Sequence, residues 1–237
     1  MSETTVSGIN WRGTALKGVL FDLDGTLLDT ASDIAHALNL ALGEYGIAAF
    51  PVSEVVLMVG RGSPVLIERA TAARGRALPE KERTAVLDRF FHHYGELEEQ
   101  GKSEAVPYPG AAEALRRLHT AGIKIAVVTN KHHRFANALM QNLKLAPWID
   151  LIVGGDTCER RKPDPQPLLF ACSSLGFTAA DALMVGDSIN DVSAARAAKI
   201  PVVCVPYGYN EGRDPRALDC DAMVETLAEL PVLLGCP

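Results

Sequence analysis

The residues best suited to chemistry stand close together in the run Phe21-Asp22-Leu23-Asp24-Gly25. Asp22 and Asp24 are two positions apart, so extended backbone turns both carboxylates toward the same side. Gly25 permits a tight turn with the backbone close to a ligand. The apolar residues before Asp22 predict a strand, and open α/β sheets bind ligands at the carboxyl ends of their strands. The pair therefore predicts an acidic site at a strand end, with an ordinary Asp-Gly turn as the alternative.

Three more polar groups follow later in the chain. They are Thr129-Asn130-Lys131, the charged stretch that ends in Lys162-Pro163-Asp164-Pro165, and Gly186-Asp187-Ser188-Ile189-Asn190-Asp191. Taken singly, each has an ordinary explanation as a helix cap, a solvated charge run or a helix N-terminus. Their order and their places at the ends of elements predict instead that they share one site with the two aspartates.

Five short apolar runs predict the strands that position these groups, at residues 18–21, 123–129, 151–153, 182–185 and 201–205. Runs that are apolar on both faces are typical of a parallel sheet covered on both sides. Amphipathic stretches at 110–121, 135–143, 167–175 and 190–198 predict helices. The alternation predicts an α/β fold with a doubly wound, Rossmann-like parallel sheet.

Residues 30–106 break this alternation and contain no convincing strand. Stretches at 30–45, 65–74 and 79–100 predict helices, and Thr30 with Asp33 resembles a capping box at the first of them. We therefore expect a core formed by residues 1–29 and 107–237. A helical domain of residues 30–106 is expected to be inserted after the first strand.

The composition excludes several classes of protein. The chain has 237 residues, 48% of them hydrophobic, and a formal net charge of −6, which argues against nucleic acid or an anionic membrane as the main partner. No apolar run is long enough for a transmembrane helix. Residues 1–15 lack the apolar segment of a secretion signal, and we expect them to form a loose tail. Five cysteines without a CxxC pair favour free thiols in the cytoplasm.

Taken together, the four polar groups closely resemble the motif set of the haloacid dehalogenase-like phosphohydrolases. The resemblance extends from Lys17 to about Glu229 and implies that the inserted helices are the small cap that one subfamily carries at this place. With Gly60-Arg61-Gly62 in the insertion, the chain is most similar to the bacterial phosphoglycolate phosphatases. The resemblance implies hydrolysis of a small phosphorylated metabolite, with 2-phosphoglycolate as the first expectation.

The same resemblance implies a role for each polar residue. Asp22 is the candidate nucleophile, which forms an aspartyl-phosphate and so divides a very slow hydrolysis into two transfers. Asp24 is the candidate general acid for the leaving alkoxide and then the base for the attacking water. Thr129 and Asn130 are expected to donate hydrogen bonds to the phosphoryl oxygens. Lys162 is expected to offset negative charge on the phosphoryl group and on Asp22.

The acidic residues also imply a metal ion. Asp22, Asp24, Asp187 and Asp191 gather up to four negative charges, which Lys162 alone does not offset. The all-oxygen ligand set favours Mg²⁺ over Zn²⁺. By resemblance, the carboxylates of Asp22 and Asp187 and the backbone carbonyl of Asp24 bind the ion directly. Asp191 is expected to orient water or Lys162 instead.

Two further residues are candidates for choosing the substrate. Arg61 lies in a glycine-flanked loop between predicted helices of the insertion, where it can bind a substrate carboxylate or another polar group. Lys131 can assist in the same way. An exposed position in a surface loop is the alternative for each of them.

Other activities on this scaffold stay open. By resemblance, dehalogenases and phosphonate hydrolases of this fold lack an acid at the place of Asp24, which favours a reaction on oxygen esters. The alternatives are a sugar-phosphate phosphatase or a β-phosphoglucomutase-like phosphotransferase, and a phosphoaspartate-bearing signalling or binding protein without turnover. We expect a monomer or a homodimer.

Overall fold

A six-stranded parallel sheet forms the centre of the computed structural model, which describes residues 9–236. The strand order is β10-β9-β8-β3-β6-β7, and every neighbouring pair is parallel. The strands are β3 (Gly18–Phe21), β6 (Lys124–Val128), β7 (Leu151–Val153), β8 (Ala182–Gly186), β9 (Val202–Cys204) and β10 (Ala222–Met223). The five predicted strands are confirmed, and β10 is too short to leave a clear signal in the sequence.

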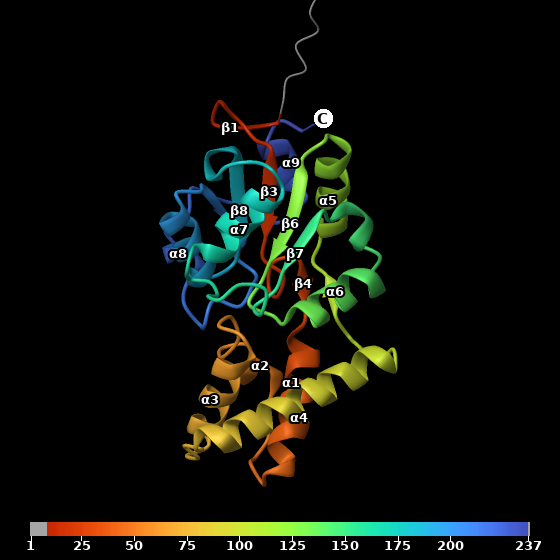
Figure 1. Cartoon of the computed structure of the whole chain (residues 1–237), viewed down its shortest axis with the longest axis vertical. Helices are drawn as coiled ribbons and strands as arrows, with labels where there is room; N and C mark the ends of the chain where they lie inside the picture. The colour runs from red at the N-terminus through yellow and green to blue at the C-terminus, as the bar shows by residue number, and fades with distance from the viewer. Residues whose placement is uncertain (1–8, 237) are drawn as a thin grey trace, which may run out of the picture.

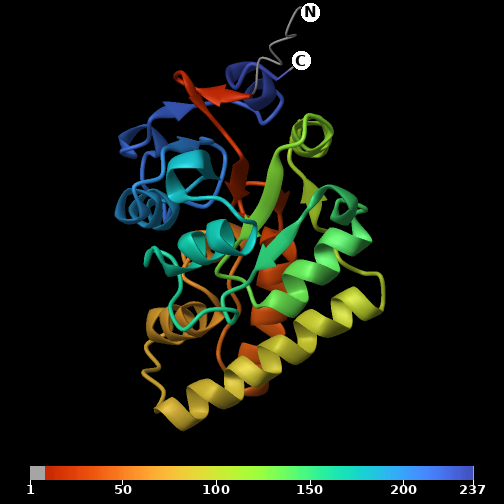
Figure 2. The same cartoon turned by 45° about the horizontal axis from the view of Figure 1, so that its top comes forward.

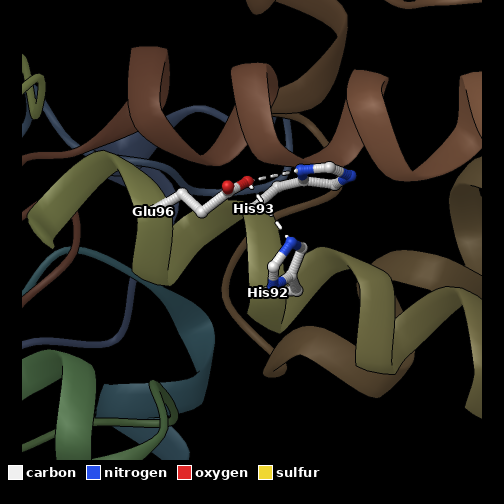
Figure 3. A group of neighbouring side chains, drawn as sticks. All are labelled: His92, His93 and Glu96. Carbon is white, nitrogen blue, oxygen red and sulfur yellow. Dashed lines mark hydrogen bonds and ion pairs between the residues drawn. The ribbon is translucent and has the colours of Figure 1, made fainter. Parts of the chain in front are cut away.

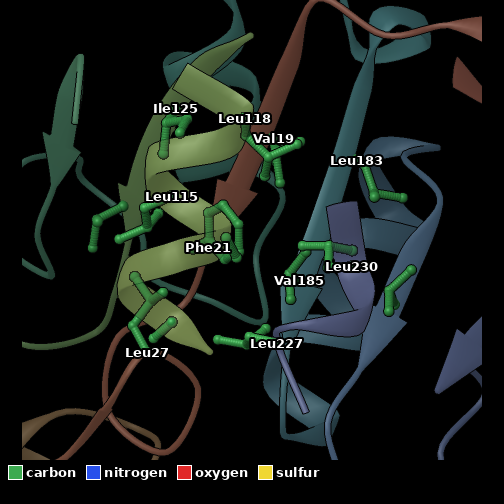
Figure 4. Packing of buried hydrophobic residues seen from close by; sticks show 14 of the residues in the cluster. Val19, Phe21, Leu27, Leu115, Leu118, Ile125, Leu183, Val185, Leu227 and Leu230 are labelled. Atoms are coloured by element: carbon green, nitrogen blue, oxygen red, sulfur yellow. The ribbon is translucent and has the colours of Figure 1, made fainter. Parts of the chain in front are cut away.

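Helices cover both faces of this sheet (Figure 1). One face carries α5 (Ala111–Thr120), α6 (His133–Asn142) and α9 (Glu229–Leu233), and the other carries α7 (Gln166–Ser174) and α8 (Ile189–Ala198). Successive strand residues face opposite sides. Val19 and Phe21 therefore join the hydrophobic cluster of Leu115 and Leu230 (Figure 4), whereas Leu20 joins the cluster on the other face. The doubly wound α/β prediction is confirmed.

Four more helices lie between β4 (Leu28–Asp29) and β5 (Val106–Pro107), two short strands that pair antiparallel. They are α1 (Ala31–Glu44), α2 (Val52–Val55), α3 (Ser63–Ala73) and α4 (Glu80–Glu99). We call these helices and their connecting loops the helical insertion. Their buried residues form a third hydrophobic cluster, which Phe135 of α6 and Tyr209 join from outside the insertion. Figure 1 shows the insertion at the end of the molecule opposite α9, and Figure 2 shows α4 beside α6.

The expected loose tail is wrong for the part that the structure describes. Residues 10–15 form a hairpin of β1 (Asn10–Trp11) and β2 (Thr14–Ala15). Ile9 and Trp11 are buried in the cluster of the sheet, and this burial holds the hairpin on the core. Residues 1–8 lie outside the described residues. Within residues 9–236, no helix is long and apolar enough to cross a membrane.

The expected capping box at α1 is also wrong. Asp33 accepts hydrogen bonds from Ser103 Oγ at 2.6 Å and from the Glu104 backbone N–H at 2.8 Å, so its carboxylate faces the end of the insertion. The Tyr209 hydroxyl accepts the Thr30 backbone N–H at 2.9 Å and takes the place of the cap. A partner 179 residues away leaves no local signal in the sequence.

The strand order reverses between β3 and β8. The chain runs from β3 to β6 and β7 on one side of the sheet, and later to β8, β9 and β10 on the other. Phe21 of β3 pairs with Val185 of β8, so Asp22 and Asp187 stand at the same end of two adjacent strands. A crevice at such a switch point is where open α/β sheets bind ligands.

Candidate active site

Asp22 and Lys162 form the centre of the site. The Asp22 backbone N–H donates to the Val185 carbonyl of β8, which fixes Asp22 at the sheet edge. The Lys162 ammonium lies 2.7 Å from Asp22 Oδ1 and 2.6 Å from Asp191 Oδ1, and Lys162 is only 3% exposed. Burial by itself lowers the pKa of Lys162, but the two carboxylates raise it above its usual range. Lys162 is therefore a permanent buried cation.

Asp187 is held tightly by the backbone around it. Thr26 Oγ1 donates to Asp187 Oδ1 at 2.9 Å, and the Tyr209 backbone N–H donates to Oδ2. Gly25 has a φ of +90°, and a Cβ there would stand 2.5 Å from Asp187 Oδ2. A Cβ at Gly208 would stand 2.2 Å from the same oxygen. Only glycine therefore fits at these two positions beside the carboxylate.

Asp191 is fully buried near the start of α8. Its Oδ1 faces Lys162, and its Oδ2 accepts hydrogen bonds from Ser188 Oγ at 2.7 Å and from the Ser188 backbone N–H at 3.1 Å. Both oxygens are thus engaged by protein groups. This carboxylate holds the Lys162 ammonium and the first turn of α8 in one position.

The acidic group fits a divalent cation. Burial, with a further contribution from Asp191, raises the pKa of Asp22 to about 7, against the opposing effect of Lys162. Burial and the neighbouring Asp191 and Asp22 raise the pKa of Asp187 well above its usual range. Carboxylate oxygens of these three residues lie within 4.8 Å of one another, and among residues 9–236 their ion pairs come from Lys162 alone. Clustered carboxylates with excess negative charge are typical ligands of hard divalent cations.

Asp24 is held from two sides. Thr30 Oγ1 donates to Asp24 Oδ1 at 2.6 Å, and the Lys131 ammonium donates to the same oxygen at 3.0 Å. Lys131 is 8% exposed, and its Nζ lies 4.5 Å from the centre of the Tyr94 ring. Burial lowers the pKa of Lys131, but Asp24 contributes to a net rise above the usual range. Thr30 is a site residue that the sequence points to only as a helix cap.

Thr129 and Asn130 lie at the end of β6 with different contacts. Thr129 Oγ1 accepts the Lys131 backbone N–H at 3.1 Å, and Thr129 lines a cavity above the sheet edge. Asn130 Nδ2 donates to the carbonyls of Gly60 at 2.8 Å and Lys162 at 2.9 Å. The Asn130 amide therefore connects the insertion, the Lys162 loop and the end of β6.

The cavity lies between the sheet edge and the helical insertion, and it opens to solvent. Its sheet wall includes Asp22, Asp24, Thr129, Asn130 and Lys131. Its facing wall is mostly apolar and includes Ile34, Val59, Leu66, Phe90 and Tyr94 of the insertion together with Phe135 of α6. The charged groups of the site thus meet a largely apolar surface, most of which the insertion supplies.

Tyr94 of α4 is the polar exception on the apolar wall. It is 1% exposed, and its hydroxyl has no hydrogen-bond partner among the described residues. Burial raises the pKa of this hydroxyl, so it stays protonated and able to donate. A buried polar group without a partner costs about 1–3 kcal/mol, which a ligand that accepts its hydrogen bond would recover. The sequence shows Tyr94 only as one aromatic residue among several on α4.

The structure does not bring Arg61 into this group. Its neighbours Gly60 and Gly62 line the cavity, but the Arg61 side chain is 43% exposed and donates from Nε to Glu211 Oε1 at 2.9 Å. Arg69 donates to the same oxygen at 2.8 Å. Arg61 thus lies in an ion-pair group on the rim, because the Glu211 carboxylate attracts both guanidinium groups.

The fold and the site define a class of protein. A crevice at a sheet switch point, a strand-end carboxylate beside a buried ammonium, and a cation-binding acidic group are suited to catalysis on a small anionic substrate. Residues 16–199 match the family of haloacid dehalogenase-like hydrolases. The chain belongs to this family, as the sequence motifs indicate, and is a hydrolase.

Similar proteins cover almost the whole chain. A phosphoglycolate phosphatase of Nitrosospira multiformis is 42% identical over 92% of this chain and 96% of its own length. A phosphoglycolate phosphatase of Salmonella typhi is 36% identical over 94% of each chain. The crystal structure of a predicted phosphoglycolate phosphatase from Haemophilus somnus superimposes with a TM-score of 0.85 at 29% identity, covering 92% of this chain and 97% of that one.

Proposed function

We propose that this hydrolase converts 2-phosphoglycolate to glycolate and phosphate through an aspartyl-phosphate on Asp22. The single observation that carries the mechanism is the Asp22 carboxylate, which lines the cavity with the Lys162 ammonium 2.7 Å from one of its oxygens. The phosphoglycolate phosphatases that are 36% and 42% identical to the chain support the substrate. Attack by Asp22 on phosphorus would give a covalent phosphoenzyme.

The reaction then has two balanced steps. In the first, an Asp22 oxygen forms a bond to phosphorus, the bond to the glycolate oxygen breaks, and that oxygen takes a proton from Asp24. In the second, water gives a proton to Asp24 and its oxygen displaces Asp22 from phosphorus. The hydrogen bonds from Thr30 and Lys131 to Asp24 Oδ1 support this role, because they fix the carboxyl group beside Asp22.

The groups around Asp22 are proposed to bind the phosphoryl oxygens. Thr129 would donate its hydroxyl and Lys162 its charge, and both are already in fixed positions at the sheet edge. Asn130 would contribute its backbone N–H, since both side-chain N–H groups are directed to protein carbonyls. Donors that are fixed before the reaction cost no reorganisation when charge develops.

The divalent cation is proposed to be Mg²⁺. Its direct ligands would be the carboxylates of Asp22 and Asp187 and the backbone carbonyl of Asp24, since hard oxygen donors suit Mg²⁺. Asp191 would hold Lys162 rather than the ion, because its Oδ1 lies 2.6 Å from the Lys162 ammonium, whereas Asp187 has no cationic partner within 4.0 Å among residues 9–236. When bound, the cation supplies positive charge that offsets the phosphoryl group and the acids.

The carboxylate end of the substrate is proposed to lie against Lys131 and Tyr94. Lys131 carries a positive charge on the sheet wall, and the Tyr94 hydroxyl is a donor without a partner in the described structure. Arg61, which the sequence favours for this role, would act from the rim at most, because Glu211 already binds its guanidinium group. An otherwise apolar wall suits a short substrate better than a sugar with many hydroxyl groups.

The arrangement of the chain supports a cap that covers the site. We propose that residues 30–106 form this cap and that residues 1–29 and 107–237 form the core. The β4–β5 pair is the neck between them, and the Asn130 contact with Gly60 ties the insertion to the core beside the cavity. A cytoplasmic location agrees with the five free thiols.

A phosphate-release screen tests this proposal. The full chain, untagged, would be assayed at neutral pH with and without Mg²⁺ on 2-phosphoglycolate, phenyl phosphate and hexose phosphates, and ranked by kcat/KM. We expect 2-phosphoglycolate to rank first and activity to require the cation. Conversion of a hexose 1-phosphate to its 6-phosphate with little phosphate released would favour the mutase. A persistent phosphoenzyme after mixing with acetyl phosphate would favour the signalling protein.

A further inference from the structure

A second group of metal-ligating side chains lies on α4, away from the cavity. It consists of His92, His93 and Glu96 (Figure 3), and none of the three lines the cavity beside Asp22. Glu96 Oε2 is 3.5 Å from His92 Nε2 and 3.2 Å from His93 Nδ1. A tetrahedral zinc ion with ligands at about 2.0–2.2 Å holds neighbouring ligand atoms roughly 3.3 Å apart. The two distances to Glu96 are close to this spacing, and all three ligand atoms lie within 4.8 Å of one another.

The His93 ring is oriented by a second carboxylate on α1. Glu44 Oε1 lies 2.6 Å from His93 Nε2, and Arg89 donates two hydrogen bonds to the Glu44 carboxylate at 2.6 and 2.8 Å. The two hydrogen bonds from Arg89 hold the Glu44 carboxylate in a fixed position facing His93. Metal-binding histidines commonly donate their other ring N–H to a carboxylate in this way.

The other ring nitrogen of His93, Nδ1, faces the Glu96 carboxylate. When Nε2 of His93 carries the hydrogen for Glu44, the neutral ring presents a lone pair at Nδ1. Nδ1 faces Glu96 Oε2, which is also an acceptor, at 3.2 Å, and His92 Nε2 approaches the same oxygen. One metal ion placed between the three residues would take an electron pair from each of these three atoms.

From this geometry we propose that His92, His93 and Glu96 bind one transition-metal dication of the zinc type, with Glu44 positioning His93. Imidazole ligands suit zinc rather than the hard cations of the acidic site. The three ligands come from α4, and the positioning carboxylate of Glu44 comes from α1. The His92 and Glu96 side chains are 50% and 43% exposed, which leaves the remaining coordination positions open to water.

Zinc titration of the full, untagged chain tests this proposal. Calorimetry would be run at neutral pH with excess Mg²⁺ to occupy the acidic site. We expect one zinc per chain. His92→Gln and Glu96→Gln should each weaken binding at least 10-fold, and Glu44→Gln should weaken it by roughly 10-fold to 100-fold.

Two controls make the result decisive. His119→Gln changes an exposed histidine on α5 and should leave zinc affinity unchanged. Retained Mg²⁺-dependent phosphatase activity or an unchanged far-ultraviolet circular dichroism spectrum shows that each variant is folded, so the test does not depend on the proposed substrate. Zinc affinity that is unchanged in His92→Gln, or equally reduced in His119→Gln, would overturn the proposal.

Discussion

The two walls of the active-site cavity differ in charge, in polarity and in how their residues are held. On the sheet wall, Asp22, Asp24 and Lys131 are ionisable groups that ion pairs and hydrogen bonds hold at the ends of β3 and β6. On the insertion wall, residues such as Phe90 pack in the third hydrophobic cluster, and the Tyr94 hydroxyl has no hydrogen-bond partner within residues 9–236. The strand ends carry the groups proposed to take part in phosphoryl transfer. The insertion supplies most of the apolar surface that faces them.

This difference indicates which step a change on each wall affects. A substitution on the sheet wall removes a group on which the chemical step depends, so it should act on every substrate alike. A substitution on the insertion wall removes a contact to the leaving group, so its effect should depend on the substrate. The predictions below test this division.

Asp22→Asn should have the largest effect. It removes the proposed nucleophile while retaining the size of the side chain, and we expect kcat to fall by roughly 10⁴-fold or more for every substrate. Asp219→Asn is a matched control, because the Asp219 side chain is 84% exposed and remote from the cavity. Near-normal turnover by a folded Asp22→Asn protein would contradict the covalent mechanism.

Asp24→Asn should slow both chemical steps. The loss of a general acid and base is expected to lower kcat by about 10² to 10⁴-fold. Rapid-quench measurements would separate phosphoenzyme formation from its hydrolysis, and both rates should decrease on 2-phosphoglycolate. If neither rate changes, Asp24 does not have the assigned role.

The pH dependence of stability should report the charge of the sheet wall. The pKa of Asp22 is raised to about 7, so the folded, metal-free protein favours the protonated acid. This contribution to the free energy of unfolding is complete below about pH 4 and is lost as pH rises through about 7. In EDTA, Asp22→Asn should therefore gain up to about 4 kcal/mol relative to the native chain between these values. Denaturant titrations at each pH measure it, and a flat difference would contradict it.

Tyr94→Phe should change substrate choice with little effect on the chemistry. The lost hydrogen bond to a charged group is expected to raise KM for 2-phosphoglycolate about 10-fold while kcat stays close to that of the native enzyme. Phenyl phosphate has no carboxylate, so its kcat/KM should stay nearly constant. Tyr45→Phe is a matched control on the same insertion, away from the cavity lining. An equal loss on both substrates would place Tyr94 in the chemical step instead.

Arg61→Ala should have the smallest effect. Arg61 lies in a partly exposed ion pair with Glu211, and such pairs contribute little, so we expect less than about a 3-fold change in kcat/KM for either substrate. A selective loss of activity on 2-phosphoglycolate would show that Arg61 moves into the cavity when substrate binds. That outcome would restore the role that the sequence suggests for it.

The sequence indicates the sheet wall well because its polar groups stand at or just after the ends of strands. Asp22, Thr129 and Asp187 stand where apolar runs end, and parallel strands bring these ends to one edge. The predicted strands and the α/β class are confirmed for the same reason, since periodicity is a local property that reflects burial. The assigned roles of these residues stay predictions until the variants are measured.

The insertion wall depends on contacts that are distant along the chain. Thr30 is a good helix cap by its local sequence, yet its hydroxyl donates to Asp24 and its N–H is held by Tyr209. The glycines on either side of Arg61 suggest a loop that reaches the cavity. The Arg61 side chain instead points to Glu211, which lies 150 residues later in the chain. Side chains compete for partners across the folded chain, and the sequence alone does not show which partner is nearest.

The sequence by itself determined the parallel sheet, the edge of the sheet at which the motif residues gather, and the family. Strand patterning and motif order are properties of consecutive residues, so they can be recognised without the fold. Only the tertiary structure decided that Lys131 pairs with Asp24, that Arg61 pairs with Glu211, and that Tyr94 carries an unpaired hydroxyl. The physical reason is that burial and hydrogen-bond satisfaction depend on every neighbour of an atom, and most of those neighbours are brought together only by folding.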